Sequence, residues 1–253
     1  MADLIRVDRQ GPVQIITINR PEARNAVNPE TAAQLRAAFE SGEADDDVLV
    51  HILTGADGHF CAGADLKSVA EGAEFEREAP MGPTWLALTK PSIAAVEGNA
   101  VAGGLELAIM CDLRVASEAA TFGVYCRRWG VPLIDGGTVR LPRLIGQSRA
   151  MDMILTGRGV GADEALSFGL ANRVVPEGEA LGEALKLAEQ IAAFPQICMR
   201  NDRTSAMRQW SLPMDEALKF EAEIGRDSMR SGASSGAARF AGGIGRGGDF
   251  GDI

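Results

Sequence analysis

The sequence predicts an α/β protein in which short strands alternate with helices, followed by a helical C-terminal region. The apolar runs Val48–Leu53 and Ser92–Val96 have strand length and each end in a turn of small residues. A helical pattern follows the second turn as far as about Met110, and Leu113–Ala116 then reads as the next strand. Of the 253 residues 46% are hydrophobic, so one or two domains with a sizeable core are expected.

The N-terminal segment is predicted to form a β-hairpin and then a helix. Leu4–Val7 and Val13–Ile18 are rich in strand-forming residues, and Gln10–Pro12 turns the chain between them. Asn28 precedes a proline, which is typical of a helix start because proline fits the first helical position. Thr31–Glu40 continues with apolar side chains at helical spacing.

Helical patterns predominate from about residue 146. Four segments are predicted as helices, namely Ser148–Leu155, Ala162–Phe168, Glu179–Ala193 and Met214–Met229. Four methionines are expected in the helix core, namely Met151, Met153, Met207 and Met214. Residues 231–253 are rich in Gly, Ala and Ser, a composition typical of flexible segments. We therefore expect a core of residues 1–145 and a helical region of residues 146–253, joined as one structural unit because no linker separates them.

Composition excludes several classes of protein. A net charge of −10 argues against nucleic-acid binding, which usually requires a basic face. The four cysteines have no CxxC spacing and the chain has two histidines, so free thiols are expected rather than disulfides or a metal site. No apolar run approaches the ~18 residues of a membrane span, and the N-terminus lacks a basic region followed by a long apolar stretch. We expect a cytoplasmic protein that binds neither metal nor membrane.

Two turns carry the strongest functional signal. His59–Leu66 and Gly98–Leu107 are small-residue turns that each follow an apolar strand. Small residues let backbone N–H groups approach a ligand closely, and two such turns side by side can direct two N–H groups at one developing oxyanion. Glu106 adds a carboxylate just inside the second helix. The arrangement points to chemistry next to a carbonyl group, such as that of an acyl thioester.

A dinucleotide site is the alternative interpretation of the second turn. Gly98–Gly103 is similar to GxGxxG after a strand, although Ala100 replaces the middle glycine. Glu118 lies about 20 residues further on, where a ribose-binding acid falls in such sites. Spacing alone leaves this interpretation open. No Gly-Lys-Ser/Thr sequence occurs, so no P-loop is expected.

The two turns and several other motifs, taken in order, resemble the crotonase superfamily of enoyl-CoA hydratases and isomerases. The motifs are Asn19–Ala26, Phe60–Leu66, Gly98–Leu107, Cys111–Arg114, Phe122–Gly123, Gly136–Thr138 and Ala165–Pro176. The resemblance extends from about residue 4 to the C-terminus. It implies a crotonase-like spiral of repeated β-β-α units, with C-terminal helices that mediate trimer contacts and help to cover coenzyme A. It also weighs against the dinucleotide interpretation.

The resemblance implies roles for individual residues in the two turns. The backbone N–H groups of Ala64 and Gly103 would form the oxyanion hole, and Glu106 matches a catalytic glutamate of the hydratases. The partial positive charge at the start of the helix would assist an enolate. In a partly dry pocket the pKa of Glu106 should rise, which suits acid–base catalysis.

The second catalytic carboxylate is where the sequence departs from the hydratase pattern. Alignment on Phe122–Gly123 and Gly136–Thr138 places Cys126 where hydratases carry their second catalytic glutamate. Asp135 falls near the position of an acid in several isomerases and ring-forming members. With Glu106 it leaves two mechanisms open, namely addition of water across a double bond and proton transfer between C2 and C4 of an enoyl chain.

Contacts with coenzyme A are also implied by the resemblance. The residues are Arg24, Ala26, Ala62, Asp65 and Leu66, and Asp65 can in addition cap the helix that follows it. Some relatives have a tail lysine that meets a phosphate, but residues 240–243 contain none, so Arg239 or Arg246 is the candidate replacement.

The sequence therefore predicts an acyl-CoA enzyme, with enoyl-CoA hydratase of fatty-acid β-oxidation as the first expectation. The alternatives are an enoyl-CoA isomerase that uses Glu106 and Asp135, and a non-catalytic acyl-CoA-binding relative. No permanently bound cofactor is expected, because coenzyme A is part of the thioester substrate. The resemblance implies a homotrimer or a hexamer formed from two trimers.

Overall fold

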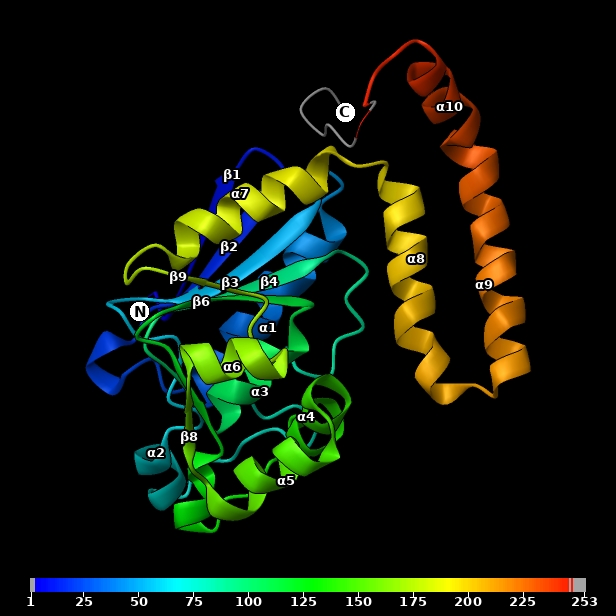
Figure 1. The fold of residues 1–253 in the computed structure, drawn as a ribbon. Coiled ribbons are helices and arrows are strands. Elements are labelled where there is room, and N and C mark those ends of the chain that lie inside the picture. The colour runs from blue at the N-terminus through cyan, green and yellow to red at the C-terminus, as the bar shows by residue number, and fades with distance from the viewer. Residues whose placement is uncertain (1–2, 246, 248–253) are drawn as a thin grey trace. The chain divides into compact units, whose positions relative to one another are not determined.

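The computed structural model describes residues 3–245 and residue 247 (Figure 1). The chain divides into two compact units, Met1–Ala188 and Glu189–Ile253.

A six-stranded sheet forms the centre of the first unit. Its strands are, in spatial order, β1 (Ile5–Gln10), β2 (Val13–Ile18), β3 (Val50–Gly55), β4 (Ser92–Val96), β6 (Leu113–Ser117) and β9 (Arg173–Val175). The first two strands are antiparallel and the remaining pairs are parallel. The predicted hairpin and the three following strands are confirmed to within a few residues. The short strand β9 was not predicted.

A second, three-stranded sheet brings the two turns into position. It consists of β5 (Asn99–Val101), β7 (Thr121–Gly123) and β8 (Gly159–Gly161). β5 leads directly into the helix that carries Glu106, so this small sheet fixes where that helix starts. Strands of three residues carry too little sequence pattern to be predicted.

Helices complete the first unit around these sheets. They are α1 (Pro29–Ala44), α2 (Leu66–Ala70), α3 (Gly103–Met110), α4 (Gly137–Ile145), α5 (Gln147–Thr156) and α6 (Ala162–Phe168), with 3₁₀ turns at Pro21–Ala23 (η1) and Tyr125–Trp129 (η2). α1 begins at Pro29, as predicted. Asn28 caps it, because its side chain accepts a hydrogen bond of 2.8 Å from the Thr31 N–H. α4 was not predicted, since it begins at a glycine and contains Pro142. α7 (Ala180–Ala193) runs across the boundary between the two units.

The core of the first unit lies between the large sheet and these helices. Ile16, Leu53 and Val96 from the sheet are buried together with Phe39 of α1 and Leu105 of α3. Burying one such side chain stabilises a fold by about 1.5–3 kcal/mol. The turns that carry the functional residues are therefore supported by the packed core.

Helices also make up the second unit. They are α8 (Gln196–Arg208), the 3₁₀ turn η3 (Gln209–Ser211), α9 (Met214–Ser228), the π-helical turn η4 (Met229–Ala233) and α10 (Ser234–Ala241). Asn201 of α8 donates hydrogen bonds of 3.1 Å to the Ile224 carbonyl oxygen and to the Ser228 Oγ, which holds α8 against α9. The flexible tail that composition suggests is helical through Ala241. Of the two candidate phosphate ligands, Arg239 lies in α10 and Arg246 lies outside the described residues.

The prediction that four methionines pack in the helix core is wrong for three of them. Met153 is fully buried, whereas Met151, Met207 and Met214 are exposed. Within residues 3–245, no helix is long and apolar enough to cross a membrane.

Candidate active site

The two turns lie side by side, as predicted. The Cys61 N–H donates a hydrogen bond of 2.8 Å to the Asn99 carbonyl oxygen, and the Val101 N–H donates one of 3.1 Å to the Cys61 carbonyl oxygen. These bonds pair Cys61 of the first turn with Ala100 of β5 in a parallel bridge. The start of α3 is thereby brought against Gly63 and Ala64.

Glycines allow this close approach. A Cβ atom at Gly63 would lie 2.9 Å from the Gly103 nitrogen, and Gly63 has a φ of +95°, which favours glycine. A Cβ atom at Gly104 would collide with the Cys61 carbonyl oxygen, which is backbone and has little freedom to move. The small residues are therefore required for the packing of one turn against the other.

The N–H groups of Ala64 and Gly103 are free to serve a ligand. Gly103 is the first residue of α3, so its N–H has no partner within the helix. Val27 bonds to the groups on either side of Ala64, namely the Gly63 carbonyl oxygen and the Asp65 N–H, which turns the Ala64 N–H away from residue 27. Among the described residues, no acceptor receives either N–H group.

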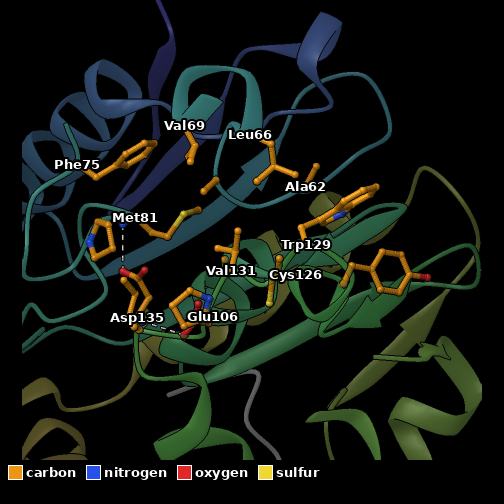
Figure 2. A pocket seen from close by; sticks show the side chains of 17 residues that line it. Ala62, Leu66, Val69, Phe75, Met81, Glu106, Cys126, Trp129, Val131 and Asp135 are labelled. Atoms are coloured by element: carbon orange, nitrogen blue, oxygen red, sulfur yellow. Dashed lines mark hydrogen bonds between the residues drawn. The ribbon is translucent and has the colours of Figure 1, made fainter. Parts of the chain in front are cut away.

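Both residues line a cavity of about 220 Å³ with largely apolar walls. Leu66, Val69 and Phe75 line one part of the wall, and η2 and the residues after it supply Trp129 and Val131 (Figure 2). The lining also contains two carboxylates, Glu106 and Asp135, and the thiol of Cys126. Such an apolar pocket with a few polar groups is typical of small-molecule sites.

Glu106 is held by one carboxylate oxygen. Its Oε1 accepts hydrogen bonds of 2.9 Å from the Asp135 N–H and 2.8 Å from the Gly137 N–H. The side chain is buried, and burial raises its pKa to about 7, with a further contribution from the negative charge of Asp135. Its Oε2 accepts no hydrogen bond from the described residues, so one oxygen is available for chemistry.

Asp135 is anchored in the same manner. Its Oδ1 accepts a hydrogen bond of 3.0 Å from the Met81 N–H and another from the Thr84 hydroxyl (Figure 2 shows the first of these). Burial raises the pKa of Asp135, although both hydrogen bonds and the charge of Arg140 lower it. Its Oδ2 has no donor among the described residues. The structure therefore brings together two buried carboxylates, each with one oxygen held and one left free.

Cys126 lies in the cavity wall within η2, and its side chain is buried. Burial and the nearby charge of Glu106 raise the pKa of the thiol. A neutral thiol is a weak hydrogen-bonding group and not a carboxylate substitute. The position that the alignment gave to a second glutamate therefore faces the cavity but carries no charge.

The residues expected to contact coenzyme A fall into two groups. Ala62 and Leu66 line the cavity, whereas Arg24, Ala26 and Asp65 do not. Arg24 is exposed, and its carbonyl oxygen accepts a hydrogen bond of 3.1 Å from the Ala62 N–H, which places it beside the first turn.

The Asp65 side chain is occupied by structural contacts. It caps α2 by accepting from the Lys67 and Ser68 N–H groups, as predicted, and it pairs with Arg20 at 2.9 Å. Burial raises the pKa of Asp65, but these hydrogen bonds outweigh burial and hold the pKa below its ordinary value. Sequence reasoning missed the partner, Arg20, although it lies within a quoted motif.

Sequence reasoning also missed the residues that hold Asp135. Met81 and Thr84 lie 54 and 51 residues before it in the chain, so no local pattern could link them to it. Arg140 of α4 donates to the carbonyl oxygens of both Asp135 and Thr84. Within residues 3–245, no cluster of three or more His, Cys, Asp or Glu side chains is arranged to hold a metal ion.

Comparison with known proteins identifies the family. A family model described as enoyl-CoA hydratase/isomerase matches residues 8–241. An enoyl-CoA hydratase of Mycobacterium tuberculosis is 41% identical over 229 residues, which cover 87% of this chain and 86% of the relative. A short-chain-enoyl-CoA hydratase of Clostridium acetobutylicum is 37% identical over 224 residues, which cover 86% of each protein.

Solved structures agree with this relationship. An enoyl-CoA hydratase of Mycobacterium marinum superposes with a TM-score of 0.90 at 36% identity, over 95% of this chain and 96% of the other. The chain therefore belongs to the enoyl-CoA hydratase/isomerase family, and the predicted crotonase-like fold is confirmed.

Proposed function

We propose that the protein adds water to a 2-enoyl-CoA thioester and releases a 3-hydroxyacyl-CoA. The observation that carries this proposal is the meeting of two free backbone N–H groups and two half-engaged carboxylates in one apolar cavity. The relatives named above as enoyl-CoA hydratases support it.

The two free N–H groups bind the oxygen of the thioester. The Ala64 and Gly103 N–H groups donate to the carbonyl oxygen and stabilise the enolate that forms when water attacks C3. One oxyanion-hole donor contributes about 2.7–4 kcal/mol to the transition state. The N-terminus of α3 adds its partial positive charge.

The two carboxyl groups share the proton transfers. One carboxylate takes a proton from water as the water oxygen bonds to C3, and the other carboxyl group delivers a proton to C2. The pair suits this because burial raises the pKa of both Glu106 and Asp135, so one can hold a proton while the other is ionised. Asp135 thus supplies the second carboxylate that position 126 lacks.

Coenzyme A enters as part of the substrate rather than as a bound cofactor. The first turn, from Ala62 to Leu66, lies along its pantetheine arm, with Arg24 near the phosphates. The apolar walls accept the acyl chain of a fatty acid in β-oxidation.

The active assembly is a homotrimer or a pair of trimers in the cytoplasm. Exposed apolar side chains in the second unit, among them Met214, Leu218 and Met229, support a protein–protein contact there. Four free cysteines suit a reducing compartment.

The test measures turnover of a short 2-enoyl-CoA and, separately, of a 3-enoyl-CoA. Wild type is expected to remove the conjugated enoyl absorbance of the first substrate, and Glu106→Gln and Asp135→Asn to lose that activity. Glu40→Gln, at an exposed carboxylate on α1, is the matched control and should retain it.

Other outcomes identify the alternatives. Appearance of conjugation from the 3-enoyl substrate without hydration would establish an isomerase. Binding of CoA esters without turnover of either would overturn both reactions and indicate a binding protein.

A further inference from the structure

A hydrogen-bond network behind Asp135 does more than complete the cavity wall. The side chain of Thr84 is 1% exposed and lies in the irregular segment before β4. Its hydroxyl donates to the Asp135 Oδ1, the same oxygen that accepts from the Met81 N–H. Two donors from one segment therefore fix one carboxylate oxygen.

Arg140 ties this segment to the loop that carries Asp135. Its guanidinium donates a hydrogen bond of 2.9 Å to the Asp135 carbonyl oxygen and one of 2.6 Å to the Thr84 carbonyl oxygen. Gly136 has a φ of +98°, and a Cβ atom there would collide with the Arg140 guanidinium. The fork of Arg140 thus holds the backbone of both partners while the hydroxyl bond joins their side chains.

The segment of residues 79–84 is itself fixed from behind. Gly82 has a φ of +97°, and a Cβ atom there would collide with the Ala32 carbonyl oxygen of α1. The Gly82 N–H closes a turn by donating to the Ala79 carbonyl oxygen at 2.7 Å. A donor held rigidly in this way can set the orientation of the carboxylate that it binds.

We propose that Thr84 is a positioning residue, whose hydroxyl sets the orientation and the proton state of the Asp135 carboxylate during catalysis. The catalytic part of this proposal rests on the proposed function. The hydroxyl stabilises the ionised carboxylate because it donates to a charged oxygen in a buried place. It also leaves Oδ2 as the oxygen that faces the cavity.

Other charged and titratable groups around Asp135 act on the same carboxylate. They are Glu106 on α3 and Arg140 on α4. The neutral thiol of Cys126 in η2 lines the same cavity. Because Glu106 and Asp135 interact, their protons leave in two steps that belong to the pair. Loss of the Thr84 hydroxyl is expected to raise the pH at which Asp135 ionises, because the ionised carboxylate then lacks one donor.

The test is a direct titration of Asp135 in the full chain. Protein labelled with ¹³C at aspartate carboxyl carbons is titrated by NMR, and the resonance absent from Asp135→Asn identifies the residue. Thr84→Val removes the hydroxyl and keeps the branched shape, so the midpoint of Asp135 should rise by about 1–2 pH units. Thr84→Ser keeps the hydroxyl and should restore the wild-type midpoint.

Activity provides the second readout. In Thr84→Val, the acid limb of the kcat/KM profile should move up with the Asp135 midpoint, and Thr84→Ser should return it. If Thr84→Val does not fold, Thr84→Cys has a weaker donor and should shift the midpoint in the same direction by less.

Two results would overturn the proposal. One is an unchanged Asp135 midpoint in Thr84→Val, and the other is an equal shift in the valine and serine variants. If the titration shifts as expected but wild type hydrates no enoyl-CoA, the proposed function fails while the control of Asp135 by Thr84 stands.

Discussion

Glu106 at the cavity and Glu43 at the end of α1 are both shielded from solvent: Glu106 is buried, and the side chain of Glu43 is 18% exposed. Burial raises the carboxyl pKa in each case, yet the outcome differs: about 7 for Glu106 and about 2 for Glu43. The difference lies in what each carboxylate oxygen accepts.

Both oxygens of Glu43 are engaged. Oε1 accepts from His51 Nε2 and the Lys90 N–H, and Oε2 accepts from the Thr89 N–H and hydroxyl. Glu106 has two donors on one oxygen, none on the other, and a second carboxylate nearby. A fully engaged carboxylate joins α1, β3 and the segment before β4. A half-engaged one is left for proton transfer.

The largest effect is expected for Glu106→Gln. The amide oxygen can still accept from the Asp135 and Gly137 N–H groups, but the side chain can no longer exchange a proton. We expect kcat for hydration to fall by about 10²–10⁴-fold, with no loss of stability at pH 8 because a buried charge is removed. Initial rates and urea unfolding check this. Full activity, or a lower free energy of unfolding, would contradict a catalytic role for the half-engaged carboxylate.

Glu43→Gln should have the opposite effect: it should lower stability and leave kcat unchanged. An amide NH₂ cannot accept the hydrogen bonds that one oxygen of Glu43 now accepts, so the donors to that oxygen lose their partner. We expect the free energy of unfolding to fall by about 1–3 kcal/mol, with kcat per folded molecule close to wild type. Urea unfolding and active-site-normalised rates measure both, and a large loss of kcat with full stability would contradict the distinction.

Glu43 and Glu106 should also give the stability of the protein opposite dependences on pH. The folded-state pKa of Glu43 is lowered from 4.5 to about 2, so its stabilisation is present above pH 4.5 and is lost as the pH falls toward 2. The folded-state pKa of Glu106 is raised from 4.5 to about 7. The stabilisation from protonated Glu106 is therefore present below pH 4.5 and is lost as the pH rises toward 7. Unfolding curves at several pH values should lose the acid-side slope in Glu43→Gln and the neutral-side slope in Glu106→Gln.

The smallest effect is expected at Asp65, whose two carboxylate oxygens are both engaged, as those of Glu43 are. Asp65→Ala removes the cap of α2 and the pair with Arg20, and should lower the free energy of unfolding by about 0.5–2 kcal/mol. Asp65→Asn keeps a capping oxygen and should cost less. Equal losses in the two variants would show that the ion pair, rather than the cap, stabilises this turn.

The regular elements of the fold could be predicted because their patterns are local. Asn28 and Pro29 mark the start of α1, and the apolar run Ser92–Val96 is β4 without any shift. α8 escaped prediction because it is polar on most of its surface and buries no residue fully. Pairing of three-residue strands such as β5 and β7 depends on the fold around them.

The candidate site could be predicted in part. Ala64, Gly103 and Glu106 stand in sequence motifs, and Asp135 was recognised beside its glycines. What holds Asp135 could not be foreseen, because Thr84 meets it only after the chain has folded over 51 residues. Hydrogen bonds of this kind set the pKa values that decide which carboxylate does chemistry.

The most direct test of the difference between the two carboxylates is the titration of Glu106 and Glu43 within one protein. Glutamate carboxyl carbons are labelled with ¹³C, and Glu106→Gln and Glu43→Gln identify the two resonances. We expect midpoints near 7 for Glu106 and near 2 for Glu43. Midpoints that both lie near the ordinary value of 4.5, or in the reverse order, would contradict it.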